Sequence, residues 1–154
     1  MSKFTTIFDE LVTTTIPSLT GFSTKTQLPN PYNLILNDVN LLNNGWGIII
    51  GDSTNADYNE LNNVWTEQEV SFVLTRVVRS THHNKTPLES AIKNLVEDAI
   101  LIKIDLLNND QITIPASIQK IDYINRTGIE FIDAEEYNIL TTTINFNFVI
   151  SESI

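Results

Sequence analysis

The side chains best suited to metal chemistry in this sequence are two adjacent histidines, His82 and His83. Adjacent histidines in a loop cannot easily point at one metal ion. No carboxylate or thiol close by completes a ligand set. We therefore interpret the pair as part of an exposed loop.

A second candidate is the acidic segment that contains Asp52, Asp57 and Glu60. Carboxylate oxygens are the ligands that Ca²⁺ prefers, but the segment lacks the alternating acidic pattern and the central glycine of an EF-hand loop. A solvated turn is the interpretation that this pattern favours.

Two pairs of carboxylates remain, Glu97-Asp98 and Glu135-Glu136. Such pairs do acid–base chemistry when burial raises the pKa of one member. Neighbouring residues on a helix point in different directions, so Glu97 and Asp98 are interpreted as a solvated helix face. Glu135 and Glu136 directly precede the last predicted strand.

The remaining motifs of enzymes are missing from the sequence. There is no Gly-x-Ser-x-Gly elbow, and five glycines give little material for a phosphate-binding loop. The segments 84–86 and 125–127 match the glycosylation pattern, but no secretory signal is expected at the N-terminus, so we interpret them as chance matches. We predict no catalytic, cofactor-binding or metal-binding residue, no cofactor and no enzymatic activity.

Composition limits the partners of this chain. The 154 residues have a size typical of one domain (1–154), and 42% hydrophobic residues suffice for a core. Cysteine is absent, which suits a reducing compartment. No apolar run is long enough to span a bilayer. A net charge of -10 disfavours sequence-specific DNA binding, but it is compatible with a surface that DNA slides past.

The most regular predicted element is a long helix. Thr86 is a suitable cap, Pro87 fits the first turn, and Glu89 can reach back to the Thr86 amide. The pattern runs to about Leu107. One apolar stripe follows from steps of three and four residues, and it comprises Leu88, Ile92, Leu95, Ala99, Ile102 and Leu106.

The sequence of the N-terminal half predicts a helix followed by a β-hairpin. The helix spans about 3–15, and Pro17 is expected to end it. Asn44-Gly45 is a preferred two-residue hairpin turn, so 34–42 and 46–50 are predicted as the hairpin arms.

Further strands are predicted at about 69–79, 117–125 and 138–151, with a short strand or loop edge at 129–132. The last strand alternates strictly between apolar and polar residues. We therefore predict an α+β fold: an antiparallel sheet with the N-terminal helix and the long amphipathic helix packed on it, plus the hairpin.

Two further features could serve binding. Trp46 and Trp65 are interpreted as core or interface anchors rather than ligand platforms. The polar face of the last strand is either solvent-exposed or meets another subunit through hydrogen bonds. It carries Thr141, Thr143, Asn145 and Asn147.

The second half of the chain resembles the tail terminator, or head–tail joining, proteins of tailed bacteriophages. The resemblance rests on the strand 70–76, the capped helix with Leu95-Val96-Glu97-Asp98, the segment 118–123 and the closing threonine-rich strand 142–149. The N-terminal helix and the hairpin fit the same plan, so the resemblance covers most of residues 1–150.

This resemblance implies a structural virion protein in the tail neck, assembled in the host cytoplasm. Members of the family form a hexameric ring that caps the tail tube, stops its polymerisation and docks the head connector. The expected partners are other copies of the chain, the tail tube protein and the head completion protein, with DNA passing through the lumen without specific binding. Alternatives are another neck, tail-tube or baseplate protein, or a small ligand-binding module or enzyme.

Overall fold

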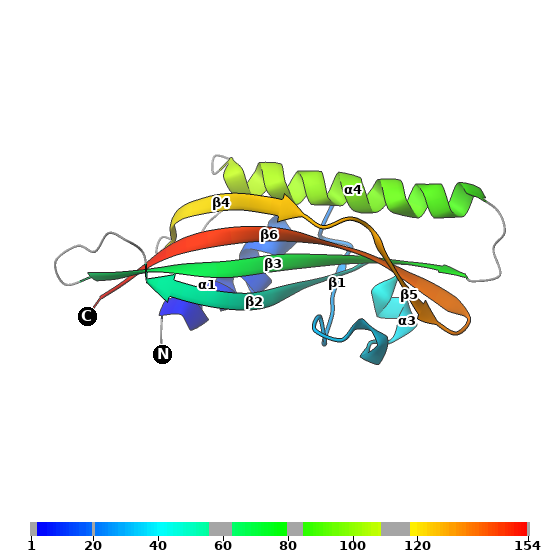
Figure 1. The fold of residues 1–154 in the computed structure, drawn as a ribbon, viewed down its shortest axis with the longest axis horizontal. Helices are drawn as coiled ribbons and strands as arrows, with labels where there is room; N and C mark the ends of the chain where they lie inside the picture. Colours follow the sequence, from blue (N-terminus) through cyan, green and yellow to red (C-terminus); the bar gives the residue numbers. More distant parts are fainter. Residues whose placement is uncertain (1–2, 20, 56–62, 80–84, 109–117, 154) are drawn as a thin grey trace.

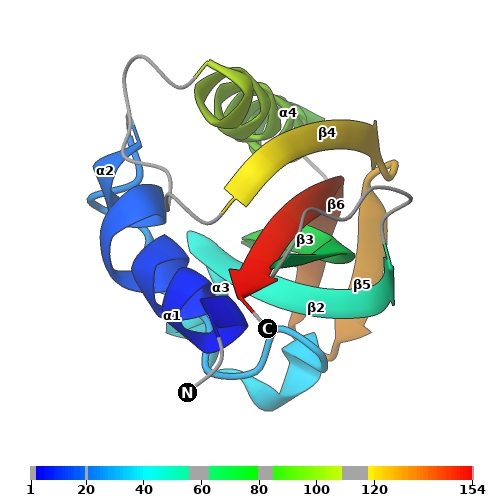
Figure 2. The same ribbon diagram turned by 90° about the vertical axis from the view of Figure 1, so that its left-hand side faces the viewer.

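The fold is built on a six-stranded, mostly antiparallel sheet that helices cover on both faces (Figures 1 and 2). The computed structural model describes residues 3–19, 21–55, 63–79, 85–108 and 118–153. This is the predicted α+β class. The elements in chain order are α1 (Lys3–Glu10), the π-helical turn η1 (Leu11–Thr15), α2 (Ile16–Ser18), β1 (Thr26–Gln27), the 3₁₀ turn η2 (Leu34–Leu36), α3 (Val39–Leu42), β2 (Gly45–Asn55), β3 (Asn63–Arg79), α4 (Lys85–Leu107), β4 (Ile118–Arg126), β5 (Glu130–Ala134) and β6 (Tyr137–Ser153).

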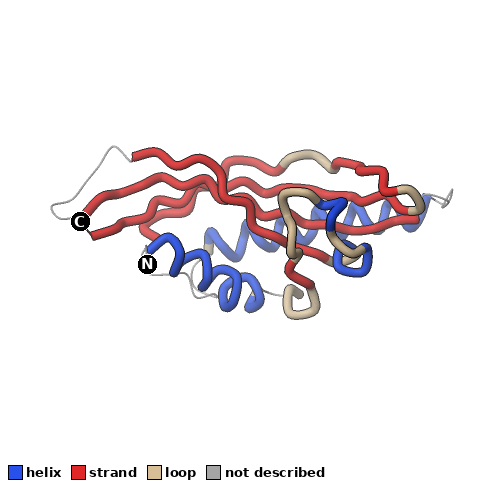
Figure 3. The backbone as a smooth tube through the Cα atoms, turned by 90° about the horizontal axis from the view of Figure 1, so that it is seen from below, coloured by secondary structure: helices blue, strands red, loops and turns tan. Residues whose placement is uncertain are grey.

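The centre of the sheet is the pairing of β3 with β6. All 17 residues of β3 pair in unbroken antiparallel register with β6, from Asn63↔Ser153 to Arg79↔Tyr137. The strand order is β1-β2-β3-β6-β4, and β5 also pairs with β6. The strands run together along the long dimension of the molecule (Figure 3).

One face of the sheet carries the main core. Phe146 on β6 lies at its centre, with ring centroids 5.6 Å from Phe72 and 5.8 Å from Tyr123. The predicted stripe of α4 packs here, and Leu95 and Leu106 are fully buried. Ile7 and Leu11 of the N-terminal helix join the same cluster. The alternating apolar residues of the last strand therefore face the core, as predicted, and they are Ile144, Phe146, Phe148 and Ile150.

The opposite face carries a smaller core over only part of its length. Val73 of β3 and Ile139 of β6 pack against Leu28, Leu34 and Leu42, which come from the segment around η2 and α3. Both faces of β3 are therefore covered around Val73, because Phe72 belongs to the main core and Val73 to the smaller one.

The prediction of a hairpin with its turn at Asn44-Gly45 is wrong. Its first arm forms η2 and α3 instead, because the Asp38 side chain accepts a hydrogen bond from the Asn40 amide and caps a short helix. Gly45 starts β2, which pairs in parallel with β1 and antiparallel with β3. The glycine is required there by close packing rather than by a turn.

A tight hairpin does occur, between β5 and β6. Ala134 pairs with Tyr137, so Glu135 and Glu136 form a two-residue turn. Glu135 has a φ of 63°, and the Asp133 carboxylate accepts a hydrogen bond from its amide. The acidic pair before the last strand is therefore a connection.

Two helix boundaries differ from the prediction. The N-terminal helix continues past Pro17 to Ser18, because the π-helical turn η1 precedes the proline and widens the helix there. Helix α4 begins at Lys85, so Thr86 lies inside the helix rather than at its cap.

Strand β4 also departs from simple alternation. A register shift between Ile118 and Lys120 turns Ile118 to the same face as Ile121 and Tyr123, and all three pack on the main core. Without this shift, simple alternation would place Ile118 on the other face, with Lys120 and Asp122.

We predict that Gly45→Ala destabilises the fold by about 1–3 kcal/mol, because an added methyl group overpacks the core. A Cβ atom at Gly45 would lie 2.6 Å from Leu28 Cδ2 and 2.8 Å from the Leu41 carbonyl oxygen. Urea denaturation measures the change. Gly128→Ala is the matched control, because a Cβ there meets nothing within 4 Å. Equal stability of the two variants would contradict this account of Gly45.

Candidate functional site

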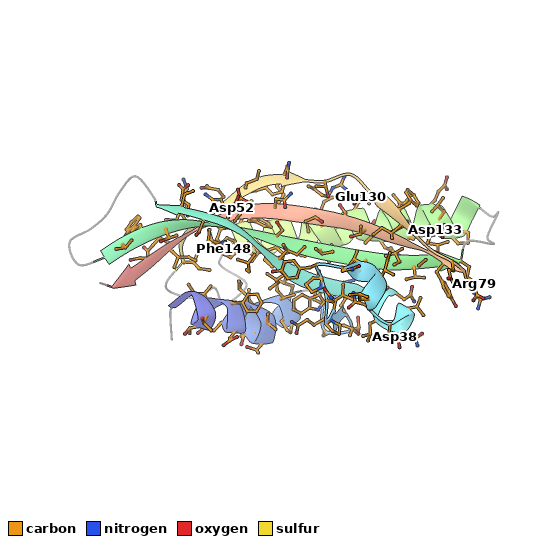
Figure 4. All side chains as sticks on the ribbon, turned by 60° about the horizontal axis from the view of Figure 1, so that its bottom comes forward. Asp38, Asp52, Arg79, Glu130, Asp133 and Phe148 are labelled. Carbon is orange, nitrogen blue, oxygen red and sulfur yellow. The ribbon has the colours of Figure 1, made fainter. Side chains whose placement is uncertain are left out.

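The structure describes only some of the residues singled out as candidates for chemistry. His82, His83, Asp57, Glu60 and Asn84 lie outside the described residues. Asp52 is exposed on β2 (Figure 4). Within the described ranges, no group of three or more acidic or histidine side chains is placed to hold a metal ion. No helix among these residues has the length and apolar character to cross a membrane.

Asp98 does not lie on a solvated helix face, which corrects the prediction for this residue. Its Oδ2 atom accepts hydrogen bonds from Lys25 Nζ and from Arg76 Nη2, both at 2.7 Å. The three side chains are only 3 to 16% exposed. Glu97, its neighbour, is exposed as predicted.

The Asp98 cluster joins four parts of the chain. Lys25 also donates to the Asn44 side chain at 2.8 Å, and Arg76 Nη1 donates to the Thr75 carbonyl at 3.1 Å. Burial lowers the pKa of Lys25, and the hydrogen bond to Asp98 partly offsets that effect. Asp98 thus holds two cations beside the core and fixes α4 relative to β3 and to the segment before β1.

A polar surface occupies the half of the second sheet face that none of the described helices covers. Here α3 and η2 no longer cover the strands, and polar residues form rows across β3, β6 and β4. In one row, Ser71 Oγ donates to Asn145 Oδ1 at 2.6 Å, and Asn145 Nδ2 donates to Asn125 Oδ1 at 2.7 Å.

The next row of this polar face is acidic. Asn147 pairs with Glu69 on one side and Asp122 on the other. Lys120 forms an ion pair with Asp122 at 3.4 Å, and both side chains are largely solvated. A hollow of about 230 Å³ on this face is lined in part by Glu69, Ser71 and Asn145. The face therefore presents hydrogen-bonding groups and carboxylates at the surface.

A larger hollow of about 680 Å³ lies between α3, the end of β3 and the first turns of α4. Its polar lining comes mainly from Asn44, Asn94 and the arginines 76 and 79. Among the residues that the structure describes, no carboxylate lines this hollow.

The remaining predicted residues have structural positions. Trp46 is buried in the main core, and Trp65 on β3 is half-buried. Arg126 Nη1 donates to Thr142 Oγ1 at 3.1 Å, and the Thr127 amide donates to the Thr143 carbonyl. The segment 125–127 therefore anchors the end of β4 to β6.

Sequence reasoning missed Lys25 and Arg76, because their partner lies 73 and 22 residues away. The one available signal was the position of Asp98 beside the apolar stripe of α4. Comparison with known proteins does not add functional residues to those described above. No known protein family matches this sequence, and no curated protein matches it either.

We predict that Asp98→Asn lowers the free energy of unfolding by roughly 3–5 kcal/mol, because two buried cations lose their carboxylate. Thermal or urea unfolding followed by circular dichroism measures the loss. Glu97→Gln makes the same chemical change on the exposed neighbour and should stay within about 0.5 kcal/mol of wild type. A small effect at Asp98, equal to that at Glu97, would show that the cluster does not hold the fold together.

Proposed function

We propose that this chain is a tail terminator of a tailed bacteriophage. It is a structural virion protein of the neck that forms a ring on the tail tube, stops tube polymerisation and provides the docking surface for the head connector. The partners of this ring are the tail tube protein and the head completion protein.

The observation that carries the proposal is the arrangement of elements around the β3–β6 ladder. The resemblance implies a strand, a long amphipathic helix and a closing threonine-rich strand in one α+β domain. In the structure, β3 and β6 pair over their whole shared length, and α4 packs across them. An N-terminal helix covers the same face. The family plan and the observed fold are therefore compatible.

The polar face gives a second line of support. DNA that passes through a ring must not be held by its phosphates, and clustered basic residues would hold it. The row of Glu69, Asn147 and Asp122 carries two carboxylates, one of which pairs with Lys120, and the net charge of the chain is -10. We propose that this face lines the lumen, where it repels the phosphate backbone.

We predict that the purified chain forms a closed ring with about six times the 17.4 kDa chain mass. Mass photometry measures the mass, and class averages of negatively stained particles show the closure. Added to polymerising tail tube protein from the same phage, the ring should shorten the tubes and occupy one end of each.

A control protein of similar charge that does not bind tubes should leave tube length unchanged. A chain that stays monomeric even with tubes present would refute the proposal. Unaided growth of the chain into long tubes would instead identify a tail-tube protein.

A further inference from the structure

Helix α4 has a second apolar face that belongs to neither of the two core clusters among the described residues. Ile100, Ile104 and Leu107 follow one another by four and three residues and are 48, 52 and 45% exposed. Val96, one turn earlier, is half-buried. We refer to these four residues as the α4 stripe. It lies about 120° around the helix from the core stripe, at 3.6 residues per turn.

This arrangement is unusual for a surface helix, whose face away from the core is normally polar. Each of the three exposed residues could be lysine or glutamate without loss of the core, since none belongs to it. An ordered row of apolar residues on a surface is typical of a contact with another protein.

A second exposed apolar group lies on the loop before α3. Tyr32, Ile35 and Leu36 are 65, 58 and 69% exposed, which are the three highest values among the large hydrophobic residues described. We refer to them as the loop patch. Beside it, a hollow of about 350 Å³ is lined in part by Ile35, Val39 and Ala134. Such a hollow can accept an aliphatic side chain.

The loop patch is held rigidly. The buried Asn37 side chain accepts from the Asn30 amide at 2.9 Å and donates to the Asn30 and Leu34 carbonyls at 2.8 and 3.1 Å. The Tyr32 hydroxyl accepts from the Ile50 amide of β2 at 3.2 Å. A loop fixed in this way loses little conformational entropy when it binds.

The two apolar groups lie on opposite sides of the molecule. The core stripe of α4 packs on one face of the sheet, whereas Leu34 and Leu42, which flank the loop patch, pack on the other. Figure 1 shows α4 along the upper edge and α3 near the lower edge of the molecule, and the first turns of α4, which precede the α4 stripe, flank the same hollow as α3. A surface on one copy can therefore meet a different surface on the next.

Acidic residues border the loop patch, whereas both lysines and glutamates border the α4 stripe. Asp38 and Asp133 lie on the side of α3 and β5 (Figure 4), and both are exposed. Asp133 and Glu135 line the hollow beside the loop patch. Lys93, Glu89 and Val96 line one hollow on α4, Glu97 is exposed close by, and Lys103 Nζ lies 4.0 Å from the centroid of the Tyr123 ring.

We propose that the α4 stripe of one copy packs on the loop patch of the next copy, with aliphatic side chains entering the hollow beside Ile35. Such a contact joins two different surfaces, so it repeats head to tail and closes into a ring when the rotation between copies allows. The inference rests on the proposed function only for that closure. A symmetric contact between the α4 stripes of two copies would leave the loop patch uncovered. Such a contact ends at a dimer, because both α4 stripes are then occupied.

Two double variants test the contact. Ile100→Glu with Ile104→Glu disables the α4 stripe, and Ile35→Glu with Leu36→Glu disables the loop patch. Val64→Glu is the matched control, because this exposed residue of β3 belongs to neither group. Circular dichroism and thermal unfolding check that each variant keeps the wild-type fold, as expected for exposed positions.

Each double variant alone should shift from the assembled mass to the mass of a single chain, while Val64→Glu keeps the wild-type mass. An equimolar mixture of the two double variants should form a dimer and nothing larger, because one intact stripe meets one intact loop patch. Analytical ultracentrifugation at high protein concentration resolves these species.

The outcomes separate this inference from the proposed function. Rings that persist in both double variants overturn the contact and leave the tail-terminator proposal standing. A mixture that stays monomeric, or a loop-patch variant that dimerises by itself, also overturns the contact. Open head-to-tail chains of wild type that the variants disrupt would support the contact and refute the ring. A wild-type chain that never associates refutes both.

Discussion

The pairing of β3 with β6 is the constraint on which the rest of the molecule depends. The register between β3 and β6 is unbroken over 17 pairs, so it determines for every residue of the two strands which face of the sheet its side chain occupies. Phe72 and Phe146 fall on the face that α4 covers, while Ser71 and Asn145 fall on the other. A shift of one residue would bury the polar rows and expose the phenylalanines, so the core and the polar face are specified together.

A sheet of this length needs a helix that stays in one position across it, and apolar packing alone allows sliding. The Asp98 cluster supplies the directional contact. It ties α4 to β3 through Arg76 and to the N-terminal segment through Lys25. Burying three charges gives little net stabilisation in itself, but a displaced helix would leave Lys25 buried without its carboxylate. The cluster therefore specifies the helix position more than it adds stability.

The sequence correctly predicts the helices and strands in which apolar residues recur with a regular period. It does not predict the features that depend on contacts between residues far apart in the chain. Leu95 and Leu106 on α4, and the alternation of β6, follow from spacing alone. The turn at Asn44-Gly45 could not be predicted correctly, because the glycine is required by Leu28 and Leu41 rather than by a local turn. The bulge that redirects Ile118 leaves no local pattern either.

The candidate surfaces were harder to predict than the fold. The polar ladder of β6 was visible in the sequence, since Asn145 and Asn147 alternate with phenylalanines, but the rows need partners from β3 and β4. The α4 stripe was present in the sequence as well, but Ile100 and Ile104 cannot be told from core residues until the core is known. The loop patch was hidden by its apolar composition, because Ile35 and Leu36 fit a strand as well as a turn.

These surfaces also constrain one another. The two apolar groups lie on layers that cover opposite faces of the sheet, and the polar rows occupy the part of one face that none of the described helices covers. If neighbouring copies meet through the apolar groups, the contact uses α4 and the loop before α3 and leaves the row of Ser71, Asn145 and Asn125 uncovered. The association of copies and the passage of DNA then depend on different residues. A single domain of this size can meet both demands because its central ladder keeps its polar and apolar side chains on separate surfaces.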